Sequence, residues 1–308
     1  GSRHQQRGAD MMHLLKPAVD FDLHIYDRRY GYAGKDADQF RFPDIFQPCI
    51  QGKLAYDEMT RAYKRYRSFL NVNSVTTSQT MFSRRVFELL ACGTPVISSY
   101  SAGIEHLLGD VVFISNSESE TRAALETLSD DEAWAKVSLA GMRRVFAEHT
   151  YEHRLGFMFE KAGLKRPAAR QASFIAMARV ETAEQVARVR DHLDIQSFKP
   201  KAVFVISDSL TAEDLQSLSA AAGQAPLRHF TSQVELRDMA DLLNTFTGAY
   251  IVRFDAGRGY GRHYLSDLKD ALLYTQPAFF GRHSHYVTGA SDTLKLTNPG
   301  WEHRHATG

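Results

Sequence analysis

The chain of 308 residues has few cysteines, almost no net charge and no long apolar run. Its two cysteines, Cys49 and Cys92, lie in apolar or turn contexts that indicate no disulfide framework, so we expect a reducing compartment, the cytoplasm. The formal net charge of +1 gives no general reason to expect nucleic acid or an anionic membrane as a partner. No stretch is long and apolar enough to cross a bilayer, and no signal-peptide pattern is present. We therefore predict neither nucleic-acid binding nor an integral membrane segment.

The composition instead indicates two globular domains. Hydrophobic residues make up 44% of the chain and charged residues 24%, which is typical of a protein with a sizeable core, and the length suits two domains. The segment 161–171 is basic, contains Gly163 and Pro167 and has no apolar periodicity, which predicts a linker. We expect domains at 3–160 and 172–308. In both, strands alternate with helices, which predicts the α/β class with two Rossmann-like, doubly wound parallel sheets.

The stretch 69–99 has the clearest pattern of elements. The expected order is a strand at 69–72, a loop at 73–79, a helix at 81–91 and, after a Gly-Thr-Pro turn, a strand that begins at Val96. Ser78 or Thr80 can cap the helix. The earlier segment 31–48 is expected to be an aromatic-rich loop, because prolines interrupt regular structure there. A strand, a loop and a helix in this order form a place where a diphosphate can bind.

Several polar residues of this stretch are candidates for ligand binding, and each also has a plain structural explanation. Arg84 and Arg85 near the start of the helix can hold a diphosphate, or they are ordinary surface charges. Asn73, Ser78 and Thr80 follow the carboxyl end of a strand, where ligands dock in open α/β sheets. Capping of the loop explains these three residues nearly as well.

The run SRRVFELLACGTPVIS (83–98) resembles the donor-binding segment of retaining GT-B glycosyltransferases. More closely, residues 20–155 are similar to the CgeB-like family of spore-maturation glycosyltransferases, through the motifs IYDRRYGY, FPDIFQPCIQGKLAYDEM, AYKRYRSFLNVNSVT and TMFSRRVFELLACGTPVIS in that order. The resemblance implies a GT-B carboxyl-terminal domain that binds a nucleotide-diphosphate sugar and requires no cofactor. In that family an acceptor domain, and a first strand with a glycine-rich turn, precede the first helix. We therefore expect a fragment that lacks this strand.

The resemblance also implies a role for Glu88. The GT-B pattern has two glutamates eight positions apart, and Glu88 matches the second, which implies a contact with the ribose hydroxyls of the donor. An ordinary exposed helix glutamate is the plain alternative. The first position of the pattern falls at Thr80, which has no carboxylate. The pattern therefore implies donor binding through Glu88 more strongly than a contact with the sugar.

The second half, in the segments 172–209 and 248–275, resembles the front part of inverting, family-2-like GT-A glycosyltransferases. The resemblance places Asp208 near the nucleotide base and makes Asp255 the first aspartate of a metal-binding D-x-D cluster. This chain instead has the sequence Asp-Ala-Gly-Arg from Asp255 to Arg258. Because glycine supplies no side-chain oxygen, we do not expect a divalent cation. Either Arg258 replaces the cation in holding a diphosphate, or the domain is a catalytically silent relic.

Two functions of different classes follow from these patterns. The first is a glycosyltransferase, or a fragment of one, with an acceptor that the sequence does not identify. The second is a non-catalytic binding or assembly module made of degenerate glycosyltransferase domains, and an epimerase of similar shape is a weaker third. Thirteen histidines raise the question of a metal, but His149 and His153 are the best-spaced pair and have no further ligand at a matching spacing. No metal site is therefore expected.

Overall fold

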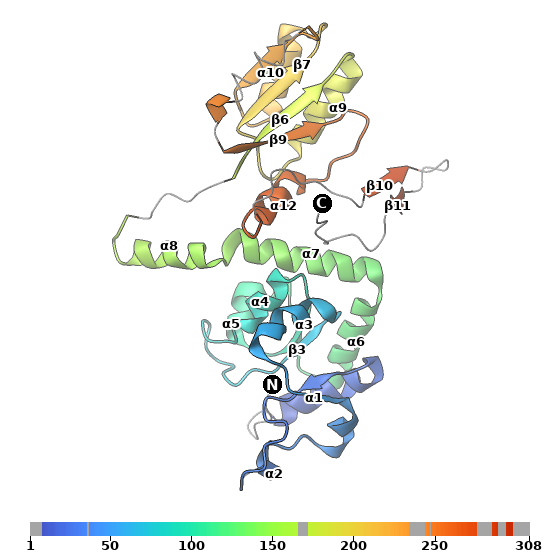
Figure 1. Cartoon of the computed structure of the whole chain (residues 1–308), viewed down its shortest axis with the longest axis vertical. Helices are drawn as coiled ribbons and strands as arrows, with labels where there is room; N and C mark the ends of the chain where they lie inside the picture. The colour runs from blue at the N-terminus through green and yellow to red at the C-terminus, as the bar shows by residue number, and fades with distance from the viewer. Residues whose placement is uncertain are drawn as a thin grey trace. The chain divides into compact units, whose positions relative to one another are not determined.

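The computed structural model describes residues 8–35, 37–165, 172–233, 244–246, 248–275, 285–288 and 294–297. The chain divides into two compact units, Gly1–Arg170 and Gln171–Gly308, which we call unit 1 and unit 2 and describe separately. Helices and strands alternate in both (Figure 1). Of the predicted linker 161–171, Lys161 is the last residue of a helix, and residues 166–171 lie outside the described part of the chain.

Unit 1 contains two parallel sheets. The first has the strand order β3-β4-β5, and the second pairs β1 with β2. The strands are β1 (Ile25–Tyr26), β2 (Ile50–Gly52), β3 (Phe69–Asn71), β4 (Val96–Ser99) and β5 (Phe113–Ser115). All four residues of β4 are buried, as expected for the central strand of a parallel sheet.

Seven α-helices surround these sheets within the described part of unit 1, together with a short helix and three 3-10 turns. The helices are α1 (Gly8–Ala18), α3 (Met59–Arg65), α4 (Arg85–Ala91), α5 (Ala102–Leu108), α6 (Glu118–Ser129), α7 (Asp131–Glu148) and α8 (Tyr151–Lys161). The short elements are η2 (Val19–Phe21), α2 (Ala37–Phe40), η3 (Asp44–Cys49) and η4 (Tyr56–Glu58). The hydroxyls of Ser117 and Thr150 and the carboxylate of Asp130 cap three of the longer helices. Helix α1 packs on α6, and α4 packs on α7.

Two local predictions for unit 1 are wrong. Helix α4 begins at Arg85 rather than Met81, and its first turn has no side-chain cap, so neither Ser78 nor Thr80 caps it. The segment 31–48, predicted as a loop, contains α2 and most of η3 and leads directly into the strand β2. These elements are short and irregular, so their apolar residues show no helical or strand period. The end of α4 is as predicted, with Gly93 in the left-handed region at φ +73°.

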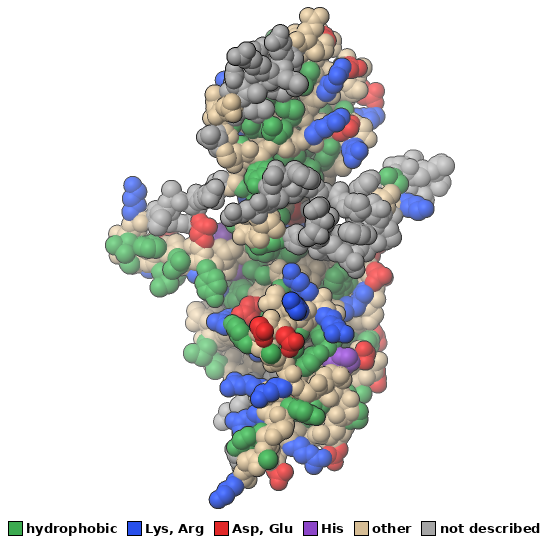
Figure 2. Space-filling view, in the orientation of Figure 1, with side chains coloured by type: hydrophobic (Ala, Val, Ile, Leu, Met, Phe, Trp, Pro, Cys, Tyr) green, Lys and Arg blue, Asp and Glu red, His purple; other side chains and the backbone are tan. Residues whose placement is uncertain are grey.

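Helix α8 contributes little to the core of unit 1. Only Gly156 of its residues is buried. The side chains of Leu155, Phe157 and Met158 are 52%, 59% and 63% exposed, and Figure 2 shows apolar side chains gathered on this helix. The main cores of unit 1 lie instead around β4, where α4 and α5 supply the largest share of one cluster and α1 and α6 most of the other.

Unit 2 contains a four-stranded parallel sheet in the order β8-β7-β6-β9. Its elements are β6 (Ser173–Arg179), α9 (Ala183–Asp194), β7 (Ala202–Ile206), α10 (Ala212–Ala221), β8 (Leu227–Phe230), η5 (Asn244–Phe246), β9 (Ala249–Phe254) and α12 (Tyr264–Ala271), followed by the antiparallel pair β10 (His285–Thr288) and β11 (Leu294–Thr297). The sequence pattern predicts no strand at β8, and it predicts a helix at 234–246, which lies mostly outside the described residues. The parallel sheets and flanking helices of both units confirm the predicted α/β, Rossmann-like fold class.

Candidate functional site

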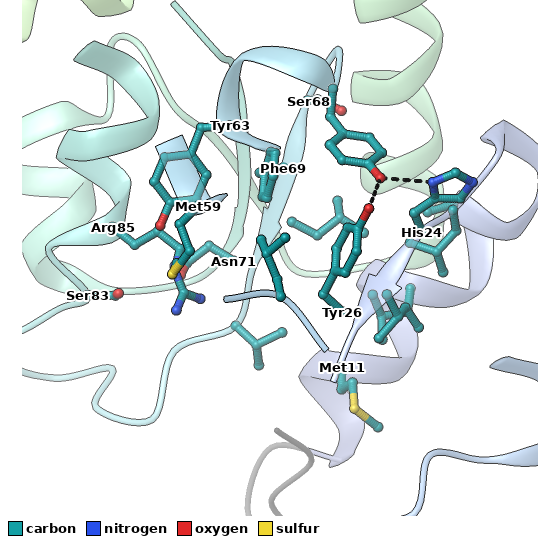
Figure 3. A pocket seen from close by; sticks show the side chains of 18 of the residues that line it. Met11, His24, Tyr26, Met59, Tyr63, Ser68, Phe69, Asn71, Ser83 and Arg85 are labelled. Carbon is teal, nitrogen blue, oxygen red and sulfur yellow. Dashed lines mark hydrogen bonds between the residues drawn. The ribbon is translucent and has the colours of Figure 1, made fainter. Parts of the chain in front are cut away.

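A cleft of about 1080 Å³ opens in unit 1 between β1, β3, α3 and the start of α4 (Figure 3). Its polar end lies where β3 finishes and α4 starts, and is lined by Asn71, Asn73, Ser83, Arg84, Arg85 and Glu88. Its other end is apolar and is lined mainly by Met11, Leu15, Leu23, Ile25, Leu70 and Val72. The polar end is at the carboxyl end of a parallel strand, which is where open α/β sheets bind ligands.

Glu88 is held in the polar end of the cleft from two directions. Its Oε1 atom lies 3.0 Å from Arg84 Nε, and its Oε2 atom accepts a hydrogen bond of 3.4 Å from the Tyr63 hydroxyl. The side chain remains 42% exposed. Helix α4 buries its opposite face, so a short amphipathic helix turns this carboxylate outward. Glu88 is therefore an oriented acceptor that a ligand hydroxyl can reach.

Positive charge surrounds Glu88 in the polar end of the cleft. Arg84 and Arg85 are both exposed at the start of α4, and the Arg85 side chain lies beside Tyr63 in Figure 3. Lys53 lines the same cleft and is also exposed. Burial raises the pKa of Tyr63, while the positive charge of Arg85 opposes this rise. The phenol therefore stays protonated at neutral pH and donates its hydrogen bond to Glu88.

Asn73 lines the cleft but its amide is used within the protein. The side chain is buried, and its Nδ2 atom donates to the Ser99 carbonyl at 2.7 Å and to Ser98 Oγ at 3.0 Å. Its Oδ1 atom accepts from Asn71 Nδ2 at 3.0 Å. These bonds join the carboxyl ends of β3 and β4. The amide group of Asn73 therefore has partners within the protein, and its contact with a ligand stays a prediction.

Ser78 and Thr80 do not line the cleft. The Ser78 hydroxyl accepts hydrogen bonds from the backbone N–H groups of Thr80 and Met81, at 3.3 and 3.1 Å, and closes a local turn. This turn packs against the start of α5, where a Cβ atom on Gly103 would lie only 3.0 Å from the Ser78 carbonyl oxygen. The structure thus brings Arg84, Arg85 and Glu88 together and leaves these two residues outside the group.

The sequence did not predict a cluster of three hydrogen-bonded residues that line the cleft. The Tyr66 hydroxyl lies 2.9 Å from His24 Nδ1 and 2.8 Å from the Tyr26 hydroxyl (Figure 3). Burial, followed by the hydrogen bond to Tyr26, raises the pKa of Tyr66 to about 12. Side chains alternate along a strand, so His24 and Tyr26 lie on the same face, and this spacing could have indicated that the two residues belong together. The partner Tyr66 is 40 residues from Tyr26 in the chain, so no local pattern could supply it.

In unit 2, Asp208 lies at a small cavity of about 210 Å³ at the carboxyl ends of β6 and β7, which Arg179 and Ser232 also line. The Asp208 Oδ1 atom accepts from the backbone N–H of Ser232 at 2.8 Å. Hydrogen bonds from Ser232 lower the pKa of Asp208, so this carboxylate is charged at neutral pH.

Asp255 follows β9 and is engaged by its neighbours. Its Oδ1 atom accepts from the backbone N–H of Gly257 at 2.9 Å, and its Oδ2 atom lies 3.7 Å from Arg253 Nη2 and 3.8 Å from Arg258 Nε. Among the residues that the structure describes, no group of three or more histidine, cysteine, aspartate or glutamate side chains could hold a metal ion. A cation at Asp255 would also meet the charge of two arginines, so this position does not fit a divalent metal.

Comparison with protein families identifies the first unit. The family described as glycosyl transferase-like matches residues 7–160, which is 154 of the 308 residues. The chain belongs to this glycosyl transferase-like family. The match covers the whole cleft with Arg84, Arg85 and Glu88, and the family implies glycosyl transfer and the binding of a nucleotide-sugar donor. No curated protein matches the glycosyl transferase-like chain. Within its described residues no helix has the length and apolar character that a membrane crossing requires.

Proposed function

We propose that unit 1 binds a nucleotide-diphosphate sugar in the polar end of the cleft and transfers the sugar to an acceptor. One observation supports this most directly. Two exposed arginines and an oriented carboxylate meet at the carboxyl end of β3, in a domain of the glycosyl transferase-like family. Guanidinium groups match a diphosphate, and a carboxylate that is already oriented accepts well from the hydroxyls of a ribose.

In this proposal each residue has one role. Glu88 accepts from the ribose hydroxyls, and Arg84 holds its carboxylate in place at 3.0 Å. Arg85 contacts the diphosphate and stabilises the negative charge that develops as the bond between sugar and phosphate breaks. Arginine side chains supply this charge stabilisation, so unit 1 needs no metal or other cofactor in our proposal. Asn73 contributes indirectly, because it fixes the ends of the two strands below the site.

The finer classification is also a proposal. The motifs in residues 20–155 support a CgeB-like enzyme with the GT-B type of donor domain, and the segments 172–209 and 248–275 support a partial GT-A-like unit 2. Cys49 and Cys92 are both free thiols, which supports a reducing location such as the cytoplasm. The acceptor, whether glycan, protein or small molecule, has no assigned contact in this proposal.

Calorimetric titration tests the donor site. The full chain is titrated with uridine and guanosine diphosphates and then with the corresponding nucleotide sugars. We expect binding of at least one nucleoside diphosphate, and slow hydrolysis of its sugar derivative that is lost in Glu88→Ala. If folded protein bound neither diphosphate, the proposed donor site would be wrong. Hydrolysis that persists in Glu88→Ala would show that the transferase site lies elsewhere.

A specific observation favours a second function for unit 2. Asp255 bonds to Gly257 and is flanked by Arg253 and Arg258, so the position of the family's metal ligand is taken by internal contacts. This supports unit 2 as a binding or assembly module rather than an independent transferase. Asp208 and Arg258 then remain candidates for nucleotide and diphosphate contacts without a metal. A protein partner that co-purifies with the chain and is retained by residues 172–308 would favour the module, whereas cation-dependent turnover by unit 2 would exclude it.

A further inference from the structure

We propose that Tyr63 is a positioning residue of the donor site, whose hydroxyl links Arg85 to Glu88. The link holds the group that contacts the diphosphate at a fixed place relative to the group that contacts the ribose. Its consequence is selectivity for a ribonucleoside diphosphate over the 2′-deoxy compound. This inference rests on the donor site proposed above and adds a residue that acts through its neighbours.

Tyr63 is anchored at its backbone and at its ring. It lies near the end of α3 and is only 4% exposed. Its carbonyl accepts a hydrogen bond of 2.6 Å from the hydroxyl of Thr94, which is buried in the turn between α4 and β4. Its ring packs edge-on against Phe69 of β3, with 5.5 Å between the ring centroids. Three separate parts of unit 1 therefore fix the place of the Tyr63 hydroxyl.

The Tyr63 hydroxyl has a partner on each side. It donates to Glu88 Oε2 at 3.4 Å, and the side chain of Arg85 donates to its oxygen. A guanidinium group has only donors and an ionised carboxylate only acceptors, so the bonds run in one direction, from Arg85 through Tyr63 to Glu88. Arg85 and Glu88 lie three positions apart on α4 and so share one face of the helix. The hydroxyl thus joins two side chains of the polar end into one unit (Figure 3).

The link determines how Glu88 presents its two oxygens to a ligand. Oε1 lies 3.0 Å from Arg84 Nε, and Oε2 faces the Tyr63 hydroxyl. Each carboxylate oxygen has two acceptor sites, so each keeps one for a ligand hydroxyl. The two neighbouring hydroxyls of a ribose match this pair, whereas a 2′-deoxyribose supplies only one. Without the Tyr63 hydroxyl the second ribose hydroxyl gains less, because the terminal torsion of a glutamate is broad and no longer fixed.

Tyr66 provides an internal comparison. It directly follows α3 and also packs edge-on against Phe69, with 5.7 Å between the ring centroids. Its hydroxyl bonds to His24 and Tyr26 instead. The two tyrosines thus share a neighbour and both line the cleft, but their hydroxyls have different partners. Loss of the hydroxyl from Tyr66 is therefore a matched control for its loss from Tyr63.

Calorimetric titration of the full chain tests the selectivity. The native chain, Tyr63→Phe and Tyr66→Phe are each titrated with uridine and guanosine diphosphates and with their 2′-deoxy counterparts. We expect the native chain to bind its preferred ribonucleotide about tenfold or more tightly than the deoxy compound, because a hydrogen bond to a charged group is lost. In Tyr63→Phe this preference should fall to about threefold or less, whereas Tyr66→Phe should keep the native ratio.

The ratio of the two affinities separates positioning from a merely structural role. A fold that is loosened by the substitution would lose affinity for both sugars equally and leave the ratio unchanged. The proposal is therefore wrong if Tyr63→Phe has the native ratio, whatever its absolute affinities.

A second measurement needs no ligand and no change at Tyr63. In a chain with ¹³C-labelled tyrosine, NMR follows the phenol carbon of Tyr63. Arg85→Ala and Glu88→Gln should each shift its resonance, whereas Arg61→Ala on the exposed face of α3 should not. A resonance that neither change shifts would overturn the link. If the native chain binds no nucleoside diphosphate, the proposed donor function fails, and this measurement still decides the link on its own.

Discussion

The Nδ2 atom of Asn73 donates to the backbone carbonyl of Ser99 at 2.7 Å, and the Ser99 hydroxyl accepts from the backbone N–H of Asn73 at 3.0 Å. These two bonds join the chain immediately after β3 to the last residue of β4. Both residues are buried, so the bonds are shielded from water. The two bonds hold the ends of β3 and β4 together at the polar end of the cleft, which gives the Asn73 side chain a structural role.

Replacement of Asn73 should therefore destabilise unit 1. Asn73→Ala removes three buried side-chain hydrogen bonds, to the Ser99 carbonyl, to Ser98 Oγ and from Asn71 Nδ2, and each such bond contributes about 0.5–1.5 kcal/mol. We expect the free energy of unfolding to fall by about 2–4 kcal/mol. Denaturant unfolding followed by Trp134 fluorescence, in a Trp301→Phe background, measures this in unit 1. The control Asn116→Ala changes an exposed residue, and an equal loss there would refute the role given to Asn73.

Replacement of Glu88 should weaken donor binding without loss of stability. Glu88→Gln keeps the size of the side chain but removes the charge that accepts from ribose hydroxyls, an interaction of about 1.5–3 kcal/mol. We expect a rise of about tenfold or more in the dissociation constant for the nucleoside diphosphate, measured by calorimetry. Glu148→Gln is the matched control, because Arg144 and Glu148 form the same (i, i+4) pair at 2.9 Å on α7, outside the cleft. Equal affinity of Glu88→Gln and the native chain would contradict the assignment.

Replacement of Arg85 should affect the diphosphate specifically. Arg85→Ala is expected to weaken binding of a nucleoside diphosphate by about tenfold and to leave binding of the nucleoside itself unchanged, because the lost contact is with phosphate. The remaining affinity should also depend less on salt concentration. Titrations at low and high salt measure both effects. Arg61→Ala, on the exposed face of α3 away from the cleft, serves as the control, and a loss of nucleoside binding in Arg85→Ala would point to a structural role instead.

His149 should make the stability of unit 1 sensitive to mild acid. Burial, followed by the charge of Arg144, lowers the pKa of His149 from 6.5. Below pH 6.5 the unfolded chain therefore binds a proton that the folded chain does not, so the free energy of unfolding falls as the pH decreases. The His149 ring packs at a tilt against Phe87, with 5.3 Å between the ring centroids. His149→Gln should flatten the pH dependence between pH 7 and 5 in urea unfolding, whereas the exposed His106→Gln should retain it.

Divalent cations should not change ligand binding by either unit. In unit 2 the Asp255 carboxylate already accepts from Gly257 and lies near Arg258, so no set of oxygen ligands is available there. We expect the same nucleotide affinity and the same rate of donor hydrolysis in magnesium, in manganese and after treatment with a chelator. A loss of affinity or activity on chelation that returns with manganese would contradict this. The double variant Gly257→Asp, Arg258→Asp is the positive control, since it restores the D-x-D cluster and removes the charge of Arg258.

Local sequence patterns were sufficient for many elements of this fold. Strands were expected at 69–72 and from Val96, and the structure has β3 at Phe69–Asn71 and β4 at Val96–Ser99. The patterns failed where elements are short, as in α2 and at the start of α4, because a helix of one or two turns contains too few residues to show a period. Asn73, Ser78 and Thr80 looked alike as polar loop residues, although their surroundings in the structure differ.

Local patterns in the sequence are sufficient to predict the order β3, loop, α4, turn and β4, and with it the position of Arg84, Arg85 and Glu88 at one end of a strand. These features depend on local periodicity and on a glycine that ends a helix, so neighbouring residues suffice to define them. Packing in three dimensions, in contrast, is what brings Asn73 to β4 and Tyr66 to His24. Each of these depends on residues about 25 or more positions apart, whose contact is set by packing and strand pairing.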